Sequence, residues 1–426
     1  MHIKKWEVAP LDRERAAQLA ERCSIPFFLA MLLEIRGFSS EAAVADLLSG
    51  GELGDPFSMK DMDKAVERIQ RALEDFEKIA VYGDYDADGV TATSILYTYL
   101  EAVGADVLYY IPQREGEGYG MNLGAVESLY HQGVSLIITV DNGIASVQEV
   151  ERARELGMDV VITDHHRPQA QIPSAYAVVD AYQPEDQSAF KDLCGAGVAL
   201  KLVMALEGEG APEILEEYAD LAALGTVADV VPVLGENRAI VKAGLRVLTR
   251  GGRAGVDALL GQSGMAGKEL SATSLAFTVI PRLNATGRMG APERAVRLLT
   301  CEGEEEAQAL SAEICEDNDL RKSVESKIAQ EAFAKIEGDP SLRYSRVLVV
   351  SGESWHHGVI GIVASRVMER YGKPCMVISL DGEMAKGSGR SVEGFSLFEA
   401  VCHCGELLER YGGHPMAAGI TLRAEN

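Results

Sequence analysis

Three acidic segments each follow directly on a short apolar run. The residues concerned are Asp84, Asp86 and Asp88 in DYDADG, Asp141 in VDNG, and Asp164, His165 and His166 in DHH. Carboxylates gathered in one place would repel one another and raise their pKa values unless a cation lies among them. Oxygen and imidazole ligands without a thiolate suit Mn²⁺ or Mg²⁺ better than a structural zinc ion. Two such ions about 3.5–4 Å apart could activate a water and stabilise charge on a phosphoryl group.

The surrounding pattern indicates how these segments meet. Short apolar runs alternate with helix-like stretches, which predicts a parallel sheet covered by helices. The expected strands are 79–82, 107–111, 136–140, 160–163 and 177–179. In such a sheet, ligands bind outside the carboxyl ends of the strands. A lone aspartate at a strand end is more often a helix N-cap, but three clusters at one edge favour a metal site.

The order of predicted helices and strands along the chain predicts an α/β protein in four parts. Residues 1–77 are expected to form a helical N-terminal extension, and residues 78–301 the parallel-sheet domain. Residues 302–338 are charged, with apolar positions at helical spacing, and we expect them to form a connecting helix. Residues 339–426 return to alternating strands and helices, including an expected helix at 397–410, and predict a second, smaller α/β domain.

Composition restricts the class of protein. The chain has 40 basic and 65 acidic residues and a net charge of −25, which speaks against a broad basic surface that coats nucleic acid. It leaves open an enzyme that neutralises phosphate locally. Seven scattered cysteines without a CxxC pair are typical of a reducing cytoplasm. The first six residues lack a signal segment, and no apolar run is long enough for a membrane span.

The acidic segments resemble, in order and spacing, the motifs of the DHH phosphoesterases, and the segment DLAALGTVADVVP at 220–232 is similar to a fourth motif. The resemblance implies one metal on Asp86 and Asp141, and another on Asp88, Asp141, His165 and Asp229. Family members often have a histidine where Tyr82 stands here, so Asp84 is a candidate for the missing ligand. His166 is expected to orient either a metal ligand or the scissile phosphate, and is counted among the catalytic residues.

Three further segments resemble the RecJ-type exonucleases within that superfamily. They are IPQREGEGYG at 111–120, IPRLNATGRMGAP at 280–292, interpreted as irregular, and KGSGRSVEGFSLFEA at 386–400. The turn YGGHPMAAG at 411–419 completes the likeness to a DHH-associated domain that grips substrate across a cleft. The resemblance implies that Arg114, Arg288, Ser388 and Arg390 bind a 5′-terminal phosphate, that Asn284 contacts substrate, and that His414 lies at the scissile phosphate. Arginine suits phosphate because its planar fork donates paired hydrogen bonds.

Several other conspicuous residues are expected to have structural roles and not functional ones. Trp355 could stack on a base, but packing is the expected role. His356 and His357 have no acidic partner nearby in sequence. Cys402, His403 and Cys404 fall on a predicted helix, where adjacent side chains point apart. No metal is expected at either place.

These expectations predict a two-metal 5′-to-3′ exonuclease specific for single-stranded DNA, with Mn²⁺ or Mg²⁺ as cofactor, acting in the cytoplasm in DNA repair and recombination. The family likeness implies a RecQ-type helicase and a single-strand-binding protein as partners, and no membrane. RecJ-type proteins usually continue into an oligonucleotide-binding barrel, whereas this sequence stops at Asn426. Two alternatives stay open: a DHH enzyme for short oligoribonucleotides or cyclic dinucleotides, and a non-enzymatic scaffold.

Overall fold

The computed structural model describes residues 7–114, 116–118, 120–208 and 211–426. The first six residues, in which we expected no signal segment, lie outside this description. The chain forms two compact units. Of the described residues, the larger unit comprises those from 7 to 286 together with 291–315, and the smaller unit comprises 287–290 and 316–426. The four-part division of the chain expected from the sequence stays a prediction.

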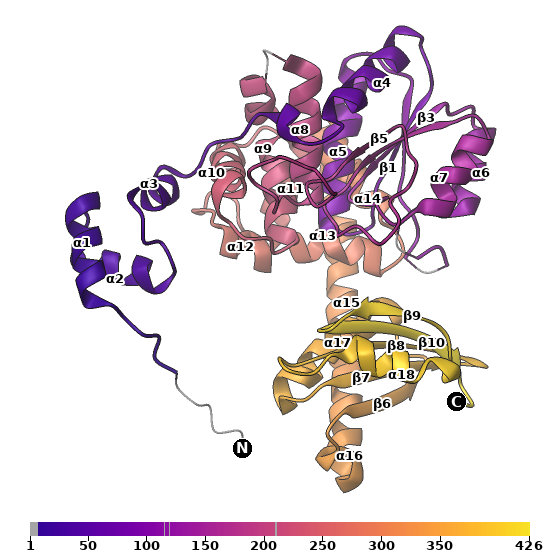
Figure 1. The fold of residues 1–426 in the computed structure, drawn as a ribbon. Helices are drawn as coiled ribbons and strands as arrows, with labels where there is room; N and C mark the ends of the chain where they lie inside the picture. The colour runs from indigo at the N-terminus through magenta and orange to yellow at the C-terminus, as the bar shows by residue number, and fades with distance from the viewer. Residues whose placement is uncertain (1–6, 115, 119, 209–210) are drawn as a thin grey trace. The chain divides into compact units, whose positions relative to one another are not determined.

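The larger unit is built on a five-stranded parallel sheet in the order β2-β1-β3-β4-β5 (Figure 1). Its strands are β1 (Ile79–Tyr82), β2 (Val107–Tyr110), β3 (Leu136–Val140), β4 (Asp159–Thr163) and β5 (Ala177–Val179). Strands β1 and β3 are buried along their whole length, which explains their unbroken apolar runs. Helices α6 (Leu123–His131) and α7 (Val147–Glu155) pack on one face of the sheet through Val126, Leu129 and Val150. The expected fold class, α/β with a parallel sheet, is confirmed.

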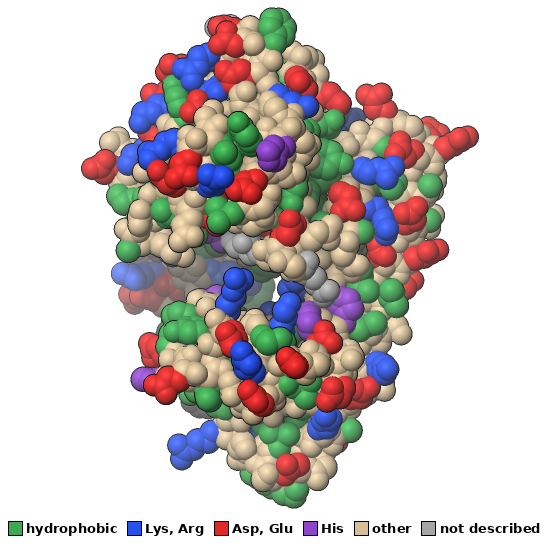
Figure 2. Space-filling model, turned by 90° about the vertical axis from the view of Figure 1, so that its right-hand side faces the viewer, with side chains coloured by type: hydrophobic (Ala, Val, Ile, Leu, Met, Phe, Trp, Pro, Cys, Tyr) green, Lys and Arg blue, Asp and Glu red, His purple; other side chains and the backbone are tan. Residues whose placement is uncertain are grey.

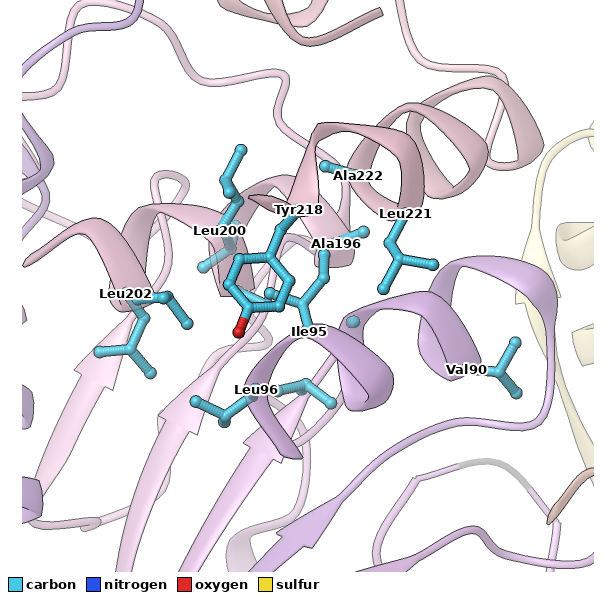
Figure 3. Close-up of a cluster of buried hydrophobic side chains, with 14 of the residues drawn as sticks. Val90, Ile95, Leu96, Ala196, Leu200, Leu202, Tyr218, Leu221 and Ala222 are labelled. Atoms are coloured by element: carbon cyan, nitrogen blue, oxygen red, sulfur yellow. The ribbon is translucent and has the colours of Figure 1, made fainter. Parts of the chain in front are cut away.

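The opposite face is covered by α4 (Met62–Glu74), α5 (Ala87–Ala102) and α8 (Gly195–Glu207), with α9 (Ala211–Ala228) packed on α5 and α8. Figure 3 shows Ile95 and Leu96 of α5, Leu200 of α8 and Leu221 of α9 gathered in one apolar cluster. All four side chains are fully buried. Burying a leucine or isoleucine side chain stabilises the fold by about 1.5–3 kcal/mol. This cluster therefore fixes α5, α8 and α9 against one another.

The N-terminal segment forms a small helical cluster of its own. Its core contains Leu19, Ala30, Leu33 and Val44. The elements are α1 (Arg13–Cys23), α2 (Phe27–Ile35), α3 (Glu41–Ser49) and the short turn η1 (Pro56–Ser58). Among the described residues, no single helix is long and apolar enough to span a membrane. Helices α1 and α2 taken together meet the length and composition criteria, but the chain bends by 119° between them.

Helices dominate the rest of the larger unit: α10 (Gly235–Arg250), α11 (Ala254–Gln262), α12 (Ala272–Phe277), α13 (Val279–Arg288), α14 (Glu293–Thr300) and the start of α15 (Glu304–Gly338). The interpretation of residues 280–292 as irregular was wrong, because α13 covers most of them. Pro281 lies in the first turn of α13, where a missing N–H costs nothing, and Gly287 lies in its last turn. Helix α15 is the long helix predicted from the charged segment.

The smaller unit contains a mixed five-stranded sheet in the order β6-β7-β8-β10-β9, in which only β6 and β7 pair in parallel. Its elements are α16 (Pro340–Tyr344), β6 (Leu348–Glu353), α17 (His357–Tyr371), β7 (Cys375–Asp381), β8 (Met384–Arg390), α18 (Leu397–His403), η3 (Gly405–Leu407), β9 (Leu408–His414) and β10 (Ala417–Arg423). The smaller α/β domain is confirmed. The expected helix at 397–410 ends at His403, and strand β9 begins soon afterwards.

Acidic and basic side chains are interspersed on the face of the molecule drawn in Figure 2. A mixed surface of this kind is typical of a protein kept in solution by its net charge.

Candidate metal centre and substrate-contact residues

The turn from β1 into α5 carries the first acidic segment. Asp86 is the N-cap of α5, and its Oδ1 accepts the N–H groups of Asp88 and Gly89, both at 3.0 Å. Asp84 is 2% exposed, and its Oδ1 has no hydrogen-bond partner among the described residues. An unpartnered buried carboxylate oxygen is costly, so its presence at this turn points to a missing cation. Tyr82, fully buried, donates its hydroxyl to the Gly120 carbonyl at 3.2 Å instead of facing this turn as a ligand.

Asp88 is held by the start of a second helix. Its Oδ2 accepts the N–H of Gly195 at 2.7 Å, and its Oδ1 accepts the N–H of Ala196 at 2.8 Å. These amides open α8, where the helix leaves N–H groups without internal partners and carries partial positive charge. Asp88 is therefore fixed in the core of the unit, 2% exposed.

Asp141 follows β3 and adopts the left-handed conformation, with φ +63°. Aspartate tolerates this conformation better than most residues. Its Oδ1 lies 3.0 Å from Nε2 of His165, which also lies 3.8 Å from Oδ2 of Asp88. The other nitrogen of His165, Nδ1, lies 3.8 Å from Oδ2 of Asp229, just past the end of α9. His165 thus lies between carboxylates from three different segments.

Asp164 organises the DHH segment from within. Its Oδ2 accepts the N–H of Ile144 at 2.9 Å, and its Oδ1 accepts the N–H of His165 and lies 2.7 Å from Nδ1 of His166. Burial would raise the pKa of Asp164, but these hydrogen bonds and the charge of His166 lower it. Burial likewise opposes protonation of His166, yet the bond to Asp164 raises the pKa of His166 to about 9. The bond to Asp164 therefore favours the protonated form of His166.

The carboxylates that face one another show the opposite behaviour. Burial, together with the charges of neighbouring aspartates, raises the pKa values of Asp84, Asp86 and Asp141, and raises that of Asp229 to about 7. Burial lowers the pKa of His165, which favours the neutral imidazole that binds metals. Raised carboxylate pKa values are what uncompensated repulsion produces in a site built for cations.

Potential ligand atoms converge in three overlapping groups, within each of which they lie no more than 4.8 Å apart. The groups are Asp84, Asp86 and Asp141; Asp88, His165 and Asp229; and Asp141, His165 and His166. Asp141 belongs to two groups and His165 to two, so the groups share members as adjoining metal sites do. The donor set, carboxylate oxygens with imidazole nitrogen, suits Mn²⁺ or Mg²⁺. The residues present therefore fit a pair of divalent cations.

Two predicted substrate residues lie beside the acidic turn. The guanidinium of Arg114 lies 5.2 Å from the centre of the Tyr85 ring, and its charge counteracts the rise in the pKa of Asp84. Asn284 accepts the N–H of Ala87, in the first turn of α5, at 2.9 Å through its Oδ1. This hydrogen bond involves only the oxygen of the Asn284 side chain, and not its amide nitrogen, which is the donor group suited to a substrate.

The remaining substrate candidates belong to the smaller unit. Arg288 donates to the Gly358 carbonyl at 3.1 Å, and Arg390 donates to Oγ of Ser388 at 3.3 Å. Gly358 and Gly361 lie in the first two turns of α17, and a Cβ on Gly361 would lie 3.1 Å from Oγ of Ser388 and 3.3 Å from Nη2 of Arg390. Two arginines and a serine thus surround the N-terminal end of one helix, an arrangement suited to an anion.

His414 lies in the same sheet as Arg390. Arg390 of β8 pairs with Ala417 of β10, and Ala417 pairs with His414 of β9. Two strand spacings separate residues in such a row by about 10 Å. His414 is exposed.

Comparison with known proteins identifies the family. A model of the DHH family, N-terminal domain, matches residues 78–226, and a DHHA1 domain model matches residues 344–426. The chain is 44% identical over 426 residues to the single-stranded-DNA-specific exonuclease RecJ of Bacillus subtilis. It is 36% identical over 440 residues to RecJ of Salmonella typhimurium, a match covering 97% of this chain and 75% of that protein. The chain belongs to the RecJ family.

Solved structures agree with this assignment. The crystal structure of RecJ from Thermus thermophilus in complex with Mn²⁺ matches with a TM-score of 0.84 and 35% identity, covering 97% of this chain and 59% of that one. The same protein in complex with Mg²⁺ matches with a TM-score of 0.76. This chain spans 53% of the length of the Bacillus subtilis relative.

Residues set aside in the sequence have structural places in this RecJ-family chain. Trp355 is 3% exposed and donates its Nε1–H to Glu331 at 2.8 Å, as a packing residue does. His356 caps α17 by accepting the N–H of Gly358. Within the described residues, all three potential metal groups lie in the larger unit and include neither the 356–357 histidines nor the 402–404 segment.

Two features of this RecJ-family site were missed in the sequence. The amides of Gly195 and Ala196, which bind Asp88, lie more than a hundred residues from it. Asp180 follows β5, is fully buried, and has an Oδ2 without a hydrogen-bond partner among the described residues. Burial raises the pKa of Asp180 to about 7. Its place after an apolar run, like that of Asp141, was the signal that could have found it.

Proposed function

We propose that this chain is a metal-dependent exonuclease that degrades single-stranded DNA from the 5′ end to mononucleotides. The convergence of Asp84, Asp86, Asp88, Asp141, His165 and Asp229 at the carboxyl edge of the parallel sheet carries the proposal. Membership of the RecJ family, whose relatives are named single-stranded-DNA-specific exonucleases, supports the substrate. The solved relative in complex with Mn²⁺ and with Mg²⁺ supports these cofactors.

We assign Asp86 and Asp141 to one cation, with Asp84 as a further ligand in the place of the family histidine. We assign Asp88, Asp141, His165 and Asp229 to the other, so that Asp141 is shared. When bound, such a pair of cations activates a water and stabilises charge on the phosphoryl group. The ring of His165 lies between two of these carboxylates, with Nε2 3.0 Å from Asp141 and Nδ1 3.8 Å from Asp229. In the neutral ring one nitrogen carries no proton, so it can bind a cation that the same carboxylates hold.

His166 has a different role. Its Nδ1 is held by Asp164, which fixes the orientation of the ring. Burial opposes protonation of His166, but the bond to Asp164 raises its pKa to about 9, which favours a charged hydrogen bond from the ring to a phosphate oxygen. We therefore propose that His166 orients the scissile phosphate.

For the 5′-terminal phosphate we propose Arg288, Ser388 and Arg390 around the start of α17. Arg114, in the larger unit, stays a separate proposal for a phosphate contact. Arginine forks and a serine hydroxyl supply the directional donors that distinguish a phosphate from other anions. Asn284 and His414 stay proposals for contacts to the strand. A helicase, a single-strand-binding protein and a cytoplasmic location are expectations from family likeness.

The deciding experiment is a nuclease assay on a single strand labelled at either end. With Mn²⁺ or Mg²⁺ we expect labelled mononucleotide to leave the 5′ end first, and EDTA to stop the reaction. Asp141→Ala should abolish degradation, and full activity in that variant would remove the mechanism. The variant Asp257→Ala, with an acidic residue outside the cluster, is the matched control.

The alternative is a DHH phosphoesterase for short oligoribonucleotides or cyclic dinucleotides, which the acidic net charge favours. Comparing a long labelled strand with a dinucleotide separates the two, because only the exonuclease prefers the long strand. A scaffold without activity would be expected to have lost at least one ligand, whereas all six predicted ligands are present.

A further inference from the structure

Three helices of the larger unit each place one glycine directly against an aspartate of the proposed metal centre. Gly89 lies in α5, Gly195 opens α8, and Gly225 lies in α9. All three are buried, and none has a positive φ. They belong to the same three helices that share the apolar cluster of Figure 3.

Backbone freedom does not explain these glycines. Because their φ values are not in the left-handed region, any residue could adopt the same backbone conformation. Glycine in a helix costs about 1 kcal/mol relative to alanine. What sets these positions apart is the space that a side chain would take.

At Gly195 that space is already filled by Asp141. A Cβ built on Gly195 would lie 2.4 Å from Cβ of Asp141 and 2.8 Å from its Cγ and Oδ1. Contacts under 3.0 Å are essentially never found for a real Cβ, so one of the two residues would have to move. The N–H of Gly195 also donates to Asp88, so this glycine contacts two proposed ligands at once.

Gly225 and Gly89 repeat the arrangement. A Cβ on Gly225 would lie 2.5 Å from Cβ of Ala196 and 2.6 Å from both Oδ1 of Asp88 and Oγ1 of Thr91. A Cβ on Gly89 would lie 2.6 Å from both Cβ and the backbone oxygen of Asp84. Each of three buried aspartates is thus backed by a glycine from a different helix. Each aspartate is therefore packed against backbone, which cannot rotate away as a side chain can.

We propose that Gly89, Gly195 and Gly225 are positioning residues of the metal centre, whose missing side chains let three helices hold Asp84, Asp141 and Asp88 at the distances that a pair of divalent cations requires. This inference rests on the proposed function. Displacing residues that orient metal ligands typically lowers metal affinity by about 10–100-fold. We expect a loss of this size for Gly195→Ala and for Gly225→Ala.

The experiment measures Mn²⁺ binding directly, by the electron paramagnetic resonance signal of free Mn²⁺, and urea unfolding of the metal-free protein. Gly244→Ala is the matched control, because its Cβ would lie 2.2 Å from the Ala219 carbonyl and 2.3 Å from Cβ of Ala223, contacts that include no proposed ligand. Gly261→Ala, with open space around its Cβ, is the neutral control. We expect Gly244→Ala to lose stability and keep Mn²⁺ affinity, and Gly261→Ala to keep both. Wild-type affinity in Gly195→Ala and Gly225→Ala, or an equal loss in Gly244→Ala, would overturn the proposal.

A second background covers the case in which Gly195→Ala does not fold. In Asp141→Gly the three atoms nearest to the added Cβ are gone, and glycine suits the left-handed backbone of that position. Gly195→Ala should therefore cost far less stability in that background than in the wild type. An equal cost in both would refute the inference. If the wild-type protein itself binds no Mn²⁺, it is the proposed function that fails.

Discussion

Replacing Asp141 by asparagine should make the metal-free protein more stable while removing its response to Mn²⁺. Asp141 is 3% exposed, and burial with the charges of Asp88 and Asp86 raises its pKa. The charged form is thus unfavourable in the fold. Asparagine keeps the size of the side chain, keeps an oxygen for His165 and tolerates the left-handed backbone.

The size of the effect follows from the geometry. The ligand atoms of Asp84, Asp86 and Asp141 lie within 4.8 Å of one another. Two unit charges at that distance repel by about 3 kcal/mol at an effective dielectric constant of about 20. Proton uptake by the cluster relieves part of this repulsion, so we expect Asp141→Asn to gain between about 1 and 3 kcal/mol at pH 8. Because the folded pKa is raised, the gain should vanish as pH falls below the ordinary aspartate pKa of about 3.9.

The assay is thermal and urea unfolding of wild type and variant, first in EDTA and then with excess Mn²⁺. At a cation concentration about 100 times the dissociation constant, the wild type should gain about 2.7 kcal/mol per site, and Asp141→Asn should gain much less. The order of stability of the two proteins would then reverse between the two conditions.

Asp164→Asn supplies the contrast. Asp164 is as buried as Asp141, but its pKa is lowered by its bonds to His166 and backbone N–H groups. Its loss should therefore destabilise the protein in EDTA. If both variants shift stability in the same direction, or if Asp141→Asn still responds to Mn²⁺ as the wild type does, the picture of a repulsive cation site is wrong.

Three further predictions concern residues away from the ligands. Arg390→Ala should reduce the preference for a 5′-phosphorylated over a 5′-hydroxyl strand in a competition assay, while Arg423→Ala, an exposed arginine of the same sheet, should not; an unchanged preference would exclude Arg390 from the phosphate site. Asp180→Asn should stabilise the EDTA-treated protein by up to about 4 kcal/mol at pH 8 and by little at pH 4. Burial raises the pKa of Asp180 in the folded protein to about 7, so the wild type loses stability as pH rises from the unfolded pKa through this value. A stabilisation that does not depend on pH in urea unfolding would contradict this prediction. Lys201 is 1% exposed, and its Nζ lies 2.8 Å from a carboxylate oxygen of Glu236. Lys201→Met should therefore lower the free energy of unfolding, measured with urea, by about 3–5 kcal/mol, because it leaves a buried charge unpaired. Adding Glu236→Gln should make this loss much smaller.

The parallel sheet and its acidic edge could be predicted because both depend on local patterns. Strands β1 and β3 are buried on both faces and therefore appear as unbroken apolar runs. Once the strands are known to be parallel, residues directly after them must share one edge. Asp141 and the DHH segment follow from that rule alone.

The errors arose where tertiary packing overrides local composition. The segment at 386–400 was placed only ahead of a helix, and the strand at its start was not predicted: KGSGR belongs to β8, which pairs with β7 and β10 on its two sides. Its buried glycines fit because Leu397 and Ile420 fill the space: a Cβ on Gly389 would lie 2.5 Å from Leu397. Likewise Pro281 and Gly287 suggested an irregular segment, but each lies near an end of α13.

The capping and metal-binding interpretations of the strand-end aspartates turn out not to exclude each other. Asp86 caps α5 through Oδ1, and Asp88 accepts two N–H groups that open α8. The partially positive ends of two helices therefore lie against the acidic cluster. They offset part of the repulsion among the carboxylates. They do not offset all of it, since the pKa values of Asp86 and Asp141 stay raised and Oδ1 of Asp84 stays without a hydrogen-bond partner among the described residues. The remaining deficit of positive charge is what a pair of divalent cations would supply.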